Sequence, residues 1–215
     1  MNITEKTEKI LEILKIKYPH AKIVLNFKNE WELLVAVILS AQCTDKKVNE
    51  VTAKLFQKYK TLSDYLKADL TEFEKDIHST GFYRAKAKNI LATAKLVKEK
   101  FGGKVPQNME ELITLHGVAR KTANIVLGNA FNIVVGVAVD THVSRVSQRL
   151  GLTKSIDPVK IEQDLMTLLP KEEWFTFTYR IIDFGREICV AKGPFCTKCP
   201  LNKFCPSALK IPGFR

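Results

Sequence analysis

Four cysteines near the C-terminus form the clearest chemical pattern in this sequence. They lie within 17 residues, in the order Cys189-x6-Cys196-x2-Cys199-x5-Cys205. Four soft thiolates in so short a segment can bind a tetrahedral metal ion or a cubane cluster without ligands from elsewhere in the chain. Structural zinc sites usually use two close cysteine pairs, and only Cys196 and Cys199 form such a pair. The spacing therefore favours an iron–sulfur cluster over zinc.

The cysteine loop is also basic. No acidic residue follows Glu187, whereas the basic residues Lys192, Lys198, Lys203, Lys210 and Arg215 do. The whole chain has 34 Lys and Arg against 23 Asp and Glu, a net charge of +11 and a pI near 9.4. A field of this sign attracts polyanions. We therefore expect a nucleic-acid partner, with Lys192 and Lys198 contacting its phosphates.

A second pattern, at residues 115–123, reads Leu-His-Gly-Val-Ala-Arg-Lys-Thr-Ala. It predicts a helix, a tight turn at Gly117 and a second helix, and it resembles the helix-hairpin-helix motif. Backbone N–H groups in such a turn can hold a DNA phosphate without reading the base sequence. The expected contacts are His116, Gly117, Val118, Ala119 and Arg120. An ordinary interhelical turn gives the same local pattern, so the hairpin alone does not decide between the two.

Lys121 and Asp140, nineteen residues apart, are the candidate reacting groups. A solvated lysine has a pKa of about 10.4 and is a poor nucleophile near neutral pH. In the first turn of a helix, facing a dry pocket, its pKa would fall and the amine would become nucleophilic. Asp140 precedes a predicted helix, so it is either an N-cap or a carboxylate that stabilises a developing positive charge. The two roles are compatible.

The elements that position these residues are predicted to be almost entirely helical. Apolar periodicity and capping signals predict helices over residues 10–18, 31–39, 48–59, 62–70, 87–101, 109–115, 120–131, 141–150, 158–169 and 174–188. Residues 133–139 have the β-branched content of a strand, which propensity alone would misassign. Residues 84–104 carry seven basic side chains and one acid, which indicates a solvated helix face or, alternatively, a phosphate contact.

Composition excludes several classes of protein. The chain has 215 residues, 46% of them hydrophobic and 27% charged, which is typical of a packed globular fold. Five clustered cysteines do not make a disulfide scaffold and indicate a reducing compartment. The N-terminus lacks the apolar segment of a signal peptide. Residues 122–139 carry no charge, but asparagines and glycines interrupt them, so we expect no membrane span.

Together these motifs resemble the endonuclease III family of DNA glycosylases and abasic-site lyases. The resemblance covers nearly the whole chain and includes Leu-Ser-Ala-Gln at 39–42, Thr44-Asp45, Gly81-Phe82-Tyr83, Lys-Thr-Ala-Asn at 121–124, Asp140-Thr141-His142 and the four cysteines. His116 and Ala119 replace a proline and a glycine of the family's hairpin, and Phe82 replaces an aliphatic residue. Alanine resists positive φ, so a left-handed Ala119 would alter the phosphate contact.

The resemblance implies a role for each site residue. Lys121 attacks C1′ of the sugar, displaces the damaged base and forms a Schiff base that permits β-elimination. Asp140 stabilises the cationic sugar. Gln42 and Phe82 fill the gap that the flipped base leaves; from the residues alone, the end of a core helix and a core aromatic are the alternatives. Cys189, Cys196, Cys199 and Cys205 hold a [4Fe-4S] cluster.

The fold implied is all-α, with two helical domains separated by a DNA-binding cleft that Lys121 and Asp140 face. Residues 22–133 form a six-helix domain with the helix-hairpin-helix, and residues 1–21 with 134–215 form a discontinuous domain with the iron–sulfur cluster loop. The function implied is excision of oxidised or ring-saturated pyrimidines from duplex DNA, followed by cleavage 3′ of the abasic site. We expect a cytoplasmic monomer, nucleoid-associated in a prokaryote.

Two alternatives remain open. One is a related adenine or mismatch glycosylase, a group that generally lacks the lysine found at position 121. The other is a noncatalytic iron–sulfur module that binds DNA and senses damage, because charge, hairpin and cysteines fit it equally well. The presence of both Lys121 and Asp140 favours an enzyme.

Overall fold

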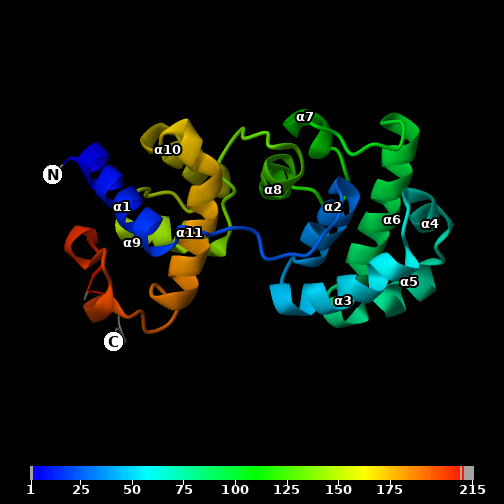
Figure 1. The fold of residues 1–215 in the computed structure, drawn as a ribbon, viewed down its shortest axis with the longest axis horizontal. Helices are drawn as coiled ribbons and strands as arrows, with labels where there is room; N and C mark the ends of the chain where they lie inside the picture. Colours follow the sequence, from blue (N-terminus) through cyan, green and yellow to red (C-terminus); the bar gives the residue numbers. More distant parts are fainter. Residues whose placement is uncertain (1, 209, 211–215) are drawn as a thin grey trace. The chain divides into compact units, whose positions relative to one another are not determined.

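The computed structural model describes residues 2–208 and residue 210, and every regular element in that part of the chain is helical (Figure 1). This confirms the all-α prediction, and residues 133–139 form no strand. The chain divides into two compact units: Val24–Val135, here the continuous unit, and Met1–Ile23 with Gly136–Arg215, here the discontinuous unit. These boundaries lie two residues beyond the expected ones. Arg215, expected to add to the basic loop, lies outside the described residues.

The continuous unit contains seven α-helices where six were expected. They are α2 (Glu30–Leu39), α3 (Asp45–Lys58), α4 (Leu62–Lys67), α5 (Leu70–Asp76), α6 (Tyr83–Lys100), α7 (Met109–Leu112) and α8 (Arg120–Phe131), with a 3-10 turn η1 (His78–Thr80). The single helix predicted over 62–70 is wrong. Ala68 is extended, with ψ 131°, and the Asp69 side chain accepts from Glu72 N at 2.9 Å, which caps a new helix.

Helix α2 is the centre of this unit. Eight of its ten residues are buried, and it packs against α3, α6 and α8. A helix that is apolar nearly all round must lie in a core, as predicted for residues 31–39. Because α2 contacts both α6 and α8, it holds the two helices that begin at Tyr83 and Arg120, directly after the segments expected to meet DNA.

The discontinuous unit has its own core. This core is formed by the apolar faces of four helices: α1 (Ile3–Lys17), α9 (Thr141–Leu150), α10 (Pro158–Leu168) and α11 (Trp174–Glu187). The loop after α11 adds Leu201. The 3-10 turns η2 (Lys171–Glu173), η3 (Cys196–Lys198) and η4 (Asn202–Phe204) complete the unit. Val137 and Val139 are buried in the same core, which explains their apolar, β-branched character without a strand.

A buried ion-pair network joins three of these elements. Glu173 is 8% exposed and lies 2.6 Å from Lys15 Nζ of α1 and 2.5 Å from Arg180 Nη1 of α11. Burial by itself raises the pKa of Glu173, but hydrogen bonds from the two cations outweigh it and hold the pKa below its ordinary value. The network therefore ties α1 to α11 more strongly when Glu173 is ionised.

None of the helices in the described part of the chain has both the length and the apolar character needed to cross a membrane.

Candidate functional site

The predicted hairpin turn is seated on α6. Gly117 has a φ of +76°, Val118 N donates to Leu115 O at 3.2 Å, and Thr93 Oγ1 of α6 donates to His116 O at 3.0 Å. A β-carbon on Gly117 would lie 2.9 Å from Asn89 Nδ2, also of α6. Only glycine therefore combines this backbone conformation with this close approach. His116 and Gly117 are exposed, and Val118 is buried beneath them.

Ala119 takes the N-cap position of α8 in extended conformation, with φ −92° and ψ 170°. The expectation that alanine would disturb a left-handed turn does not apply, since positive φ occurs at Gly117 instead. An alanine cap supplies no side-chain acceptor to the first turn of α8. The N–H groups of a helix start together with basic side chains favour an anion there.

Lys121 is the second residue of α8 and is exposed. It lies in the first turn, as predicted. The dry pocket expected around its amine is not formed by the described residues of its own unit. Its position after an exposed hairpin turn nevertheless makes the amine accessible to a ligand held at the helix start.

Asp140 is the N-cap of α9. Its Oδ1 accepts from His142 N and Val143 N, each at 2.8 Å, and its Oδ2 lies 3.1 Å from His142 Nδ1. The carboxylate is 16% exposed, so it is held firmly yet reaches solvent. Two backbone N–H groups therefore hold one oxygen of the carboxylate in a fixed orientation.

Gln42 and Phe82 share an unusual backbone. Their φ angles are +53° and +48°, and among the non-glycine residues that the structure describes only Asn132 is also positive. Asn132 is the C-cap of α8, where left-handed residues are common. Both Gln42 and Phe82 are exposed, Phe82 to 65%. The core alternative for Phe82 is therefore wrong, whereas Gln42, three residues after the end of the buried helix α2, remains compatible with the polar end of a core helix.

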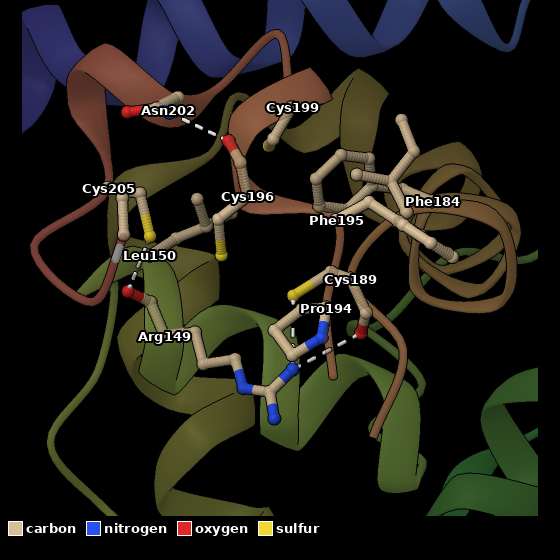
Figure 2. A pocket seen from close by; sticks show the side chains of 12 residues that line it. Arg149, Leu150, Phe184, Cys189, Pro194, Phe195, Cys196, Cys199, Asn202 and Cys205 are labelled. Atoms are coloured by element: carbon tan, nitrogen blue, oxygen red, sulfur yellow. Dashed lines mark hydrogen bonds between the residues drawn. The ribbon is translucent and has the colours of Figure 1, made fainter. Parts of the chain in front are cut away.

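All four C-terminal cysteines line one pocket (Figure 2). Figure 2 shows their sulfur atoms facing a common space, with Leu150, Phe184 and Phe195 among the apolar lining residues. Among the residues that the structure describes, no three His, Cys, Asp or Glu side chains form a single-ion site. Burial raises the pKa of Cys199 to about 11 and also raises that of Cys205. The donor set and the cavity fit a polynuclear cluster, whose binding would displace these protons.

Polar contacts fix the cysteine loop to α9. Arg149 donates to Val190 O at 2.7 Å, to Ala191 O at 2.8 Å and to Cys189 Sγ at 3.4 Å. Cys205 Sγ in turn donates to Arg149 O at 3.2 Å, and Asn202 Nδ2 donates to Cys196 O at 2.7 Å. Lys192 and Lys198 of the same loop are both exposed. The loop thus has a packed inner side and exposed cations.

Sequence reasoning missed two basic residues. Arg149 has no local signal, because its partners lie about forty residues away. Lys86 was counted in the basic run of residues 84–104, yet it is 4% exposed. Its spacing of four residues before Ile90, on the apolar stripe of α6, was a signal that could have found it.

Comparison with known proteins identifies the class. Residues 35–171 match the family described as HhH-GPD superfamily base excision DNA repair protein. The chain is 54% identical over 204 residues to endonuclease III of Synechocystis sp., covering 95% of this chain and 93% of that relative. It is 50% identical over 194 residues to endonuclease III of Bacillus subtilis, covering 90% and 88%.

The structure also matches a solved one, that of a trapped endonuclease III–DNA covalent intermediate in its estranged-adenine complex. The TM-score is 0.94 and the sequence identity 44%, and the match covers 98% of this chain and 99% of the other. The fold and the hairpin thus define a base excision DNA repair protein of the HhH-GPD superfamily. Within that superfamily, the chain belongs to the endonuclease III family.

Proposed function

We propose that the protein is a bifunctional DNA glycosylase and abasic-site lyase of base excision repair, acting on oxidised or ring-saturated pyrimidines in duplex DNA. The observation that carries the proposal is Lys121, an exposed amine in the first turn of α8 directly after the helix-hairpin-helix turn. The similarity to an endonuclease III trapped covalently on DNA supports it.

Lys121 is the proposed nucleophile. Its neutral amine attacks C1′ of the damaged nucleotide, and the bond from C1′ to the base breaks with the electron pair leaving on the base. Loss of the amine proton and opening of the sugar ring leave an imine between Nζ and C1′. The imine acidifies C2′–H, so removal of that proton breaks the C3′–O bond and cleaves the strand. One residue therefore serves both steps.

Asp140 is proposed to stabilise the positive charge that develops on the sugar as the base departs. The hydrogen bonds from His142 N and Val143 N keep its charged oxygens in one orientation, so little reorganisation is needed during the reaction. N-capping of α9 supplies the rigidity.

Binding is proposed to rest on phosphate contacts and on filling of the base stack. The proposed contacts to the DNA phosphate backbone are His116, Gly117, Val118, Ala119, Arg120, Lys192 and Lys198. Gln42 and Phe82 are proposed to enter the DNA base stack. We propose a [4Fe-4S] cluster on Cys189, Cys196, Cys199 and Cys205. When bound, the cluster joins four thiolates and so fixes the loop that presents Lys192 and Lys198. We propose that the continuous unit is the domain that carries the hairpin, and that the discontinuous unit is the domain that carries the cluster.

We propose that the protein acts as a monomer in a reducing cytoplasm; the number and clustering of its five cysteines, which do not make a disulfide scaffold, support this placement.

Borohydride trapping tests the proposal, since only an amine nucleophile forms a reducible imine. Wild-type protein should give a covalent adduct with a duplex that contains an abasic site, and should release a ring-saturated pyrimidine. Lys121→Gln should lose the adduct and strand cleavage, while retaining duplex binding. Lys60→Gln, which removes another exposed lysine of the same unit, should behave as wild type.

Asp140→Asn in the same assay should slow base release at least tenfold and leave binding within about threefold, because asparagine still caps α9 but carries no charge. Wild-type binding without an adduct would favour the noncatalytic DNA-binding module. Release of adenine or a mismatched base without cleavage would favour the related glycosylases.

A further inference from the structure

A buried lysine that the proposed mechanism does not use lies beside the two segments expected to enter the base stack. We propose that Lys86 is a positioning residue that holds Gln42 and Phe82 in the conformation needed to replace a flipped nucleotide. It does so by binding the backbone just before each of them. The inference rests on the proposed function, because it assigns Lys86 to the base-flipping step of that reaction.

The contacts of Lys86 link two distant segments. Its Nζ donates to Leu39 O and to Thr80 O, each at 2.8 Å. Leu39 is the last residue of α2, and Thr80 is the last residue of η1. One ammonium group therefore joins the ends of two helices, 47 and 6 residues away in sequence. Gln42 follows the first carbonyl by three residues, and Phe82 follows the second by two.

The conformations of Gln42 and Phe82 need such support. Both are left-handed, which side chains with a β-carbon adopt only at an energetic cost. Neither residue is held by burial, since both are exposed. Strain of this kind persists only where the surrounding structure enforces it. The enforcing contacts must therefore act on the backbone of each segment.

The backbone around Phe82 is attached to Lys86 twice. Lys86 N donates to Phe82 O at 3.1 Å in the first turn of α6, while Lys86 Nζ donates to Thr80 O. On the other segment, Ser40 Oγ donates to Val37 O at 2.8 Å and Cys43 N donates to Ser40 O at 3.1 Å. These local bonds shape the turn that contains Gln42, and Lys86 anchors that turn to α6.

A lysine is chemically suited to this position. The carbonyl of Leu39 lies at the C-terminal, partially negative end of α2, where a cation is stabilised. Burial lowers the pKa of Lys86, yet each of its two carbonyl partners needs a donor that an apolar residue lacks. Methionine has a similar length and would leave both buried carbonyls without this donor. The nucleophile role is excluded for Lys86, because its amine is buried within the unit.

Fluorescence of 2-aminopurine measures the positioning directly. The duplex carries a tetrahydrofuran abasic analogue, which cannot form an imine, with 2-aminopurine as the opposite base. Wild-type binding should unstack the probe and raise its fluorescence. At saturating protein, Lys86→Met should lose at least half of that rise. Excision of a ring-saturated pyrimidine under single-turnover conditions should fall at least tenfold, whereas trapping at a preformed abasic site should fall less than threefold.

The smaller effect on trapping separates positioning from general damage to the fold, because an abasic nucleotide has no base to unstack. Leu55→Ala destabilises the same unit from the buried face of α3 and provides a control matched in thermal stability. It should leave fluorescence and both rates unchanged. In a Phe82→Ala background, Lys86→Met should have a clearly smaller effect on excision than it has alone. Should Lys86→Met fold poorly, Lys86→Leu, which also lacks a donor, gives the same readouts.

A folded Lys86→Met or Lys86→Leu protein with the full fluorescence rise and wild-type excision would overturn the inference. So would equal losses in Leu55→Ala, or full additivity with Phe82→Ala. Failure of the proposed function is distinct: wild-type protein would then neither trap nor excise, while the fluorescence comparison on the tetrahydrofuran duplex would still report whether Lys86 positions the two segments.

Discussion

Replacement of Gly117 by alanine tests the seating of the hairpin on α6. The φ of +76° at this residue costs an L-amino acid about 1–2 kcal/mol. The new β-carbon would lie 2.9 Å from Asn89 Nδ2, 3.2 Å from Asn89 Cβ and 3.3 Å from Asn89 Cγ. The Asn89 amide can rotate, but the Asn89 β-carbon moves only with α6. Overpacking of this kind typically costs a further ~1–3 kcal/mol. We expect the free energy of unfolding to fall by about 2–5 kcal/mol.

Binding should fall as well. The turn can escape the contact only by moving away from α6, which would break the bond from Thr93 Oγ1 to His116 O. The N–H groups at the start of α8 would then no longer face a phosphate in the same geometry. We expect affinity for a tetrahydrofuran duplex to fall about tenfold, equivalent to about 1.4 kcal/mol. Urea unfolding and fluorescence anisotropy measure the two effects.

Gly102→Ala is the matched control for stability. Gly102 also has positive φ, +60°, but a β-carbon there meets no atom within 4 Å, so only the backbone cost of about 1–2 kcal/mol applies. Asn89→Ala combined with Gly117→Ala should recover part of the loss, because it removes the amide. If Gly117→Ala is no more destabilising than Gly102→Ala and binds DNA as wild type does, the reasoning about the packed turn is refuted.

Three further predictions follow from other parts of the molecule. Replacing both Lys192 and Lys198 by Gln should reduce the slope of log affinity against log salt concentration by up to about two units, because each phosphate contact contributes about 0.9. An unchanged slope would show that the loop does not contact DNA. Purified protein should contain about four irons per chain and absorb broadly in the visible range, with Cys43→Ser unaffected, whereas one zinc in a colourless protein would contradict the cluster. The pKa of Glu173 is lower in the folded state than in the unfolded state, so ionised Glu173 stabilises the fold above its unfolded-state pKa, and this stabilisation is lost as pH falls through its folded-state pKa. The free energy of unfolding measured against pH should show this loss on the acid side. In Glu173→Gln, this part of the pH dependence should be absent.

The extent to which this fold was predictable depends on how local its signals are. Helices α8 and α9 have the predicted bounds, because Gly117, Asp140 and Gly151 mark their ends through backbone geometry within a few residues. The break between α4 and α5 was missed, since Asp69 can cap a helix or lie within one. Six helices were expected in residues 22–133, and the unit Val24–Val135 has seven for this reason.

The candidate site shows the same division. Residue types and spacing alone marked the four cysteines as ligands of one metal site, because close spacing of soft donors is a property of the sequence. Lys121 and Asp140 were found through helix starts and the family resemblance. Their proposed roles remain predictions. Exposure of Phe82 and of Gln42 required the structure, because a core aromatic and an interfacial wedge have the same residue type.

The sequence by itself determined the features that depend on local residues or on composition: the helix starts, the glycine turn, the cysteine spacing and the overall positive charge. Only the tertiary structure decided which distant groups meet. Lys86 lies among solvated lysines in the sequence, yet the packing of α2 against α6 brings Leu39 O to its amine. Arg149 likewise finds its carbonyl partners only because α9 packs on α11, from which the cysteine loop departs. A buried donor must meet an acceptor, and apart from Cys189 Sγ the acceptors of both residues are backbone carbonyls, which any residue carries and no sequence pattern marks.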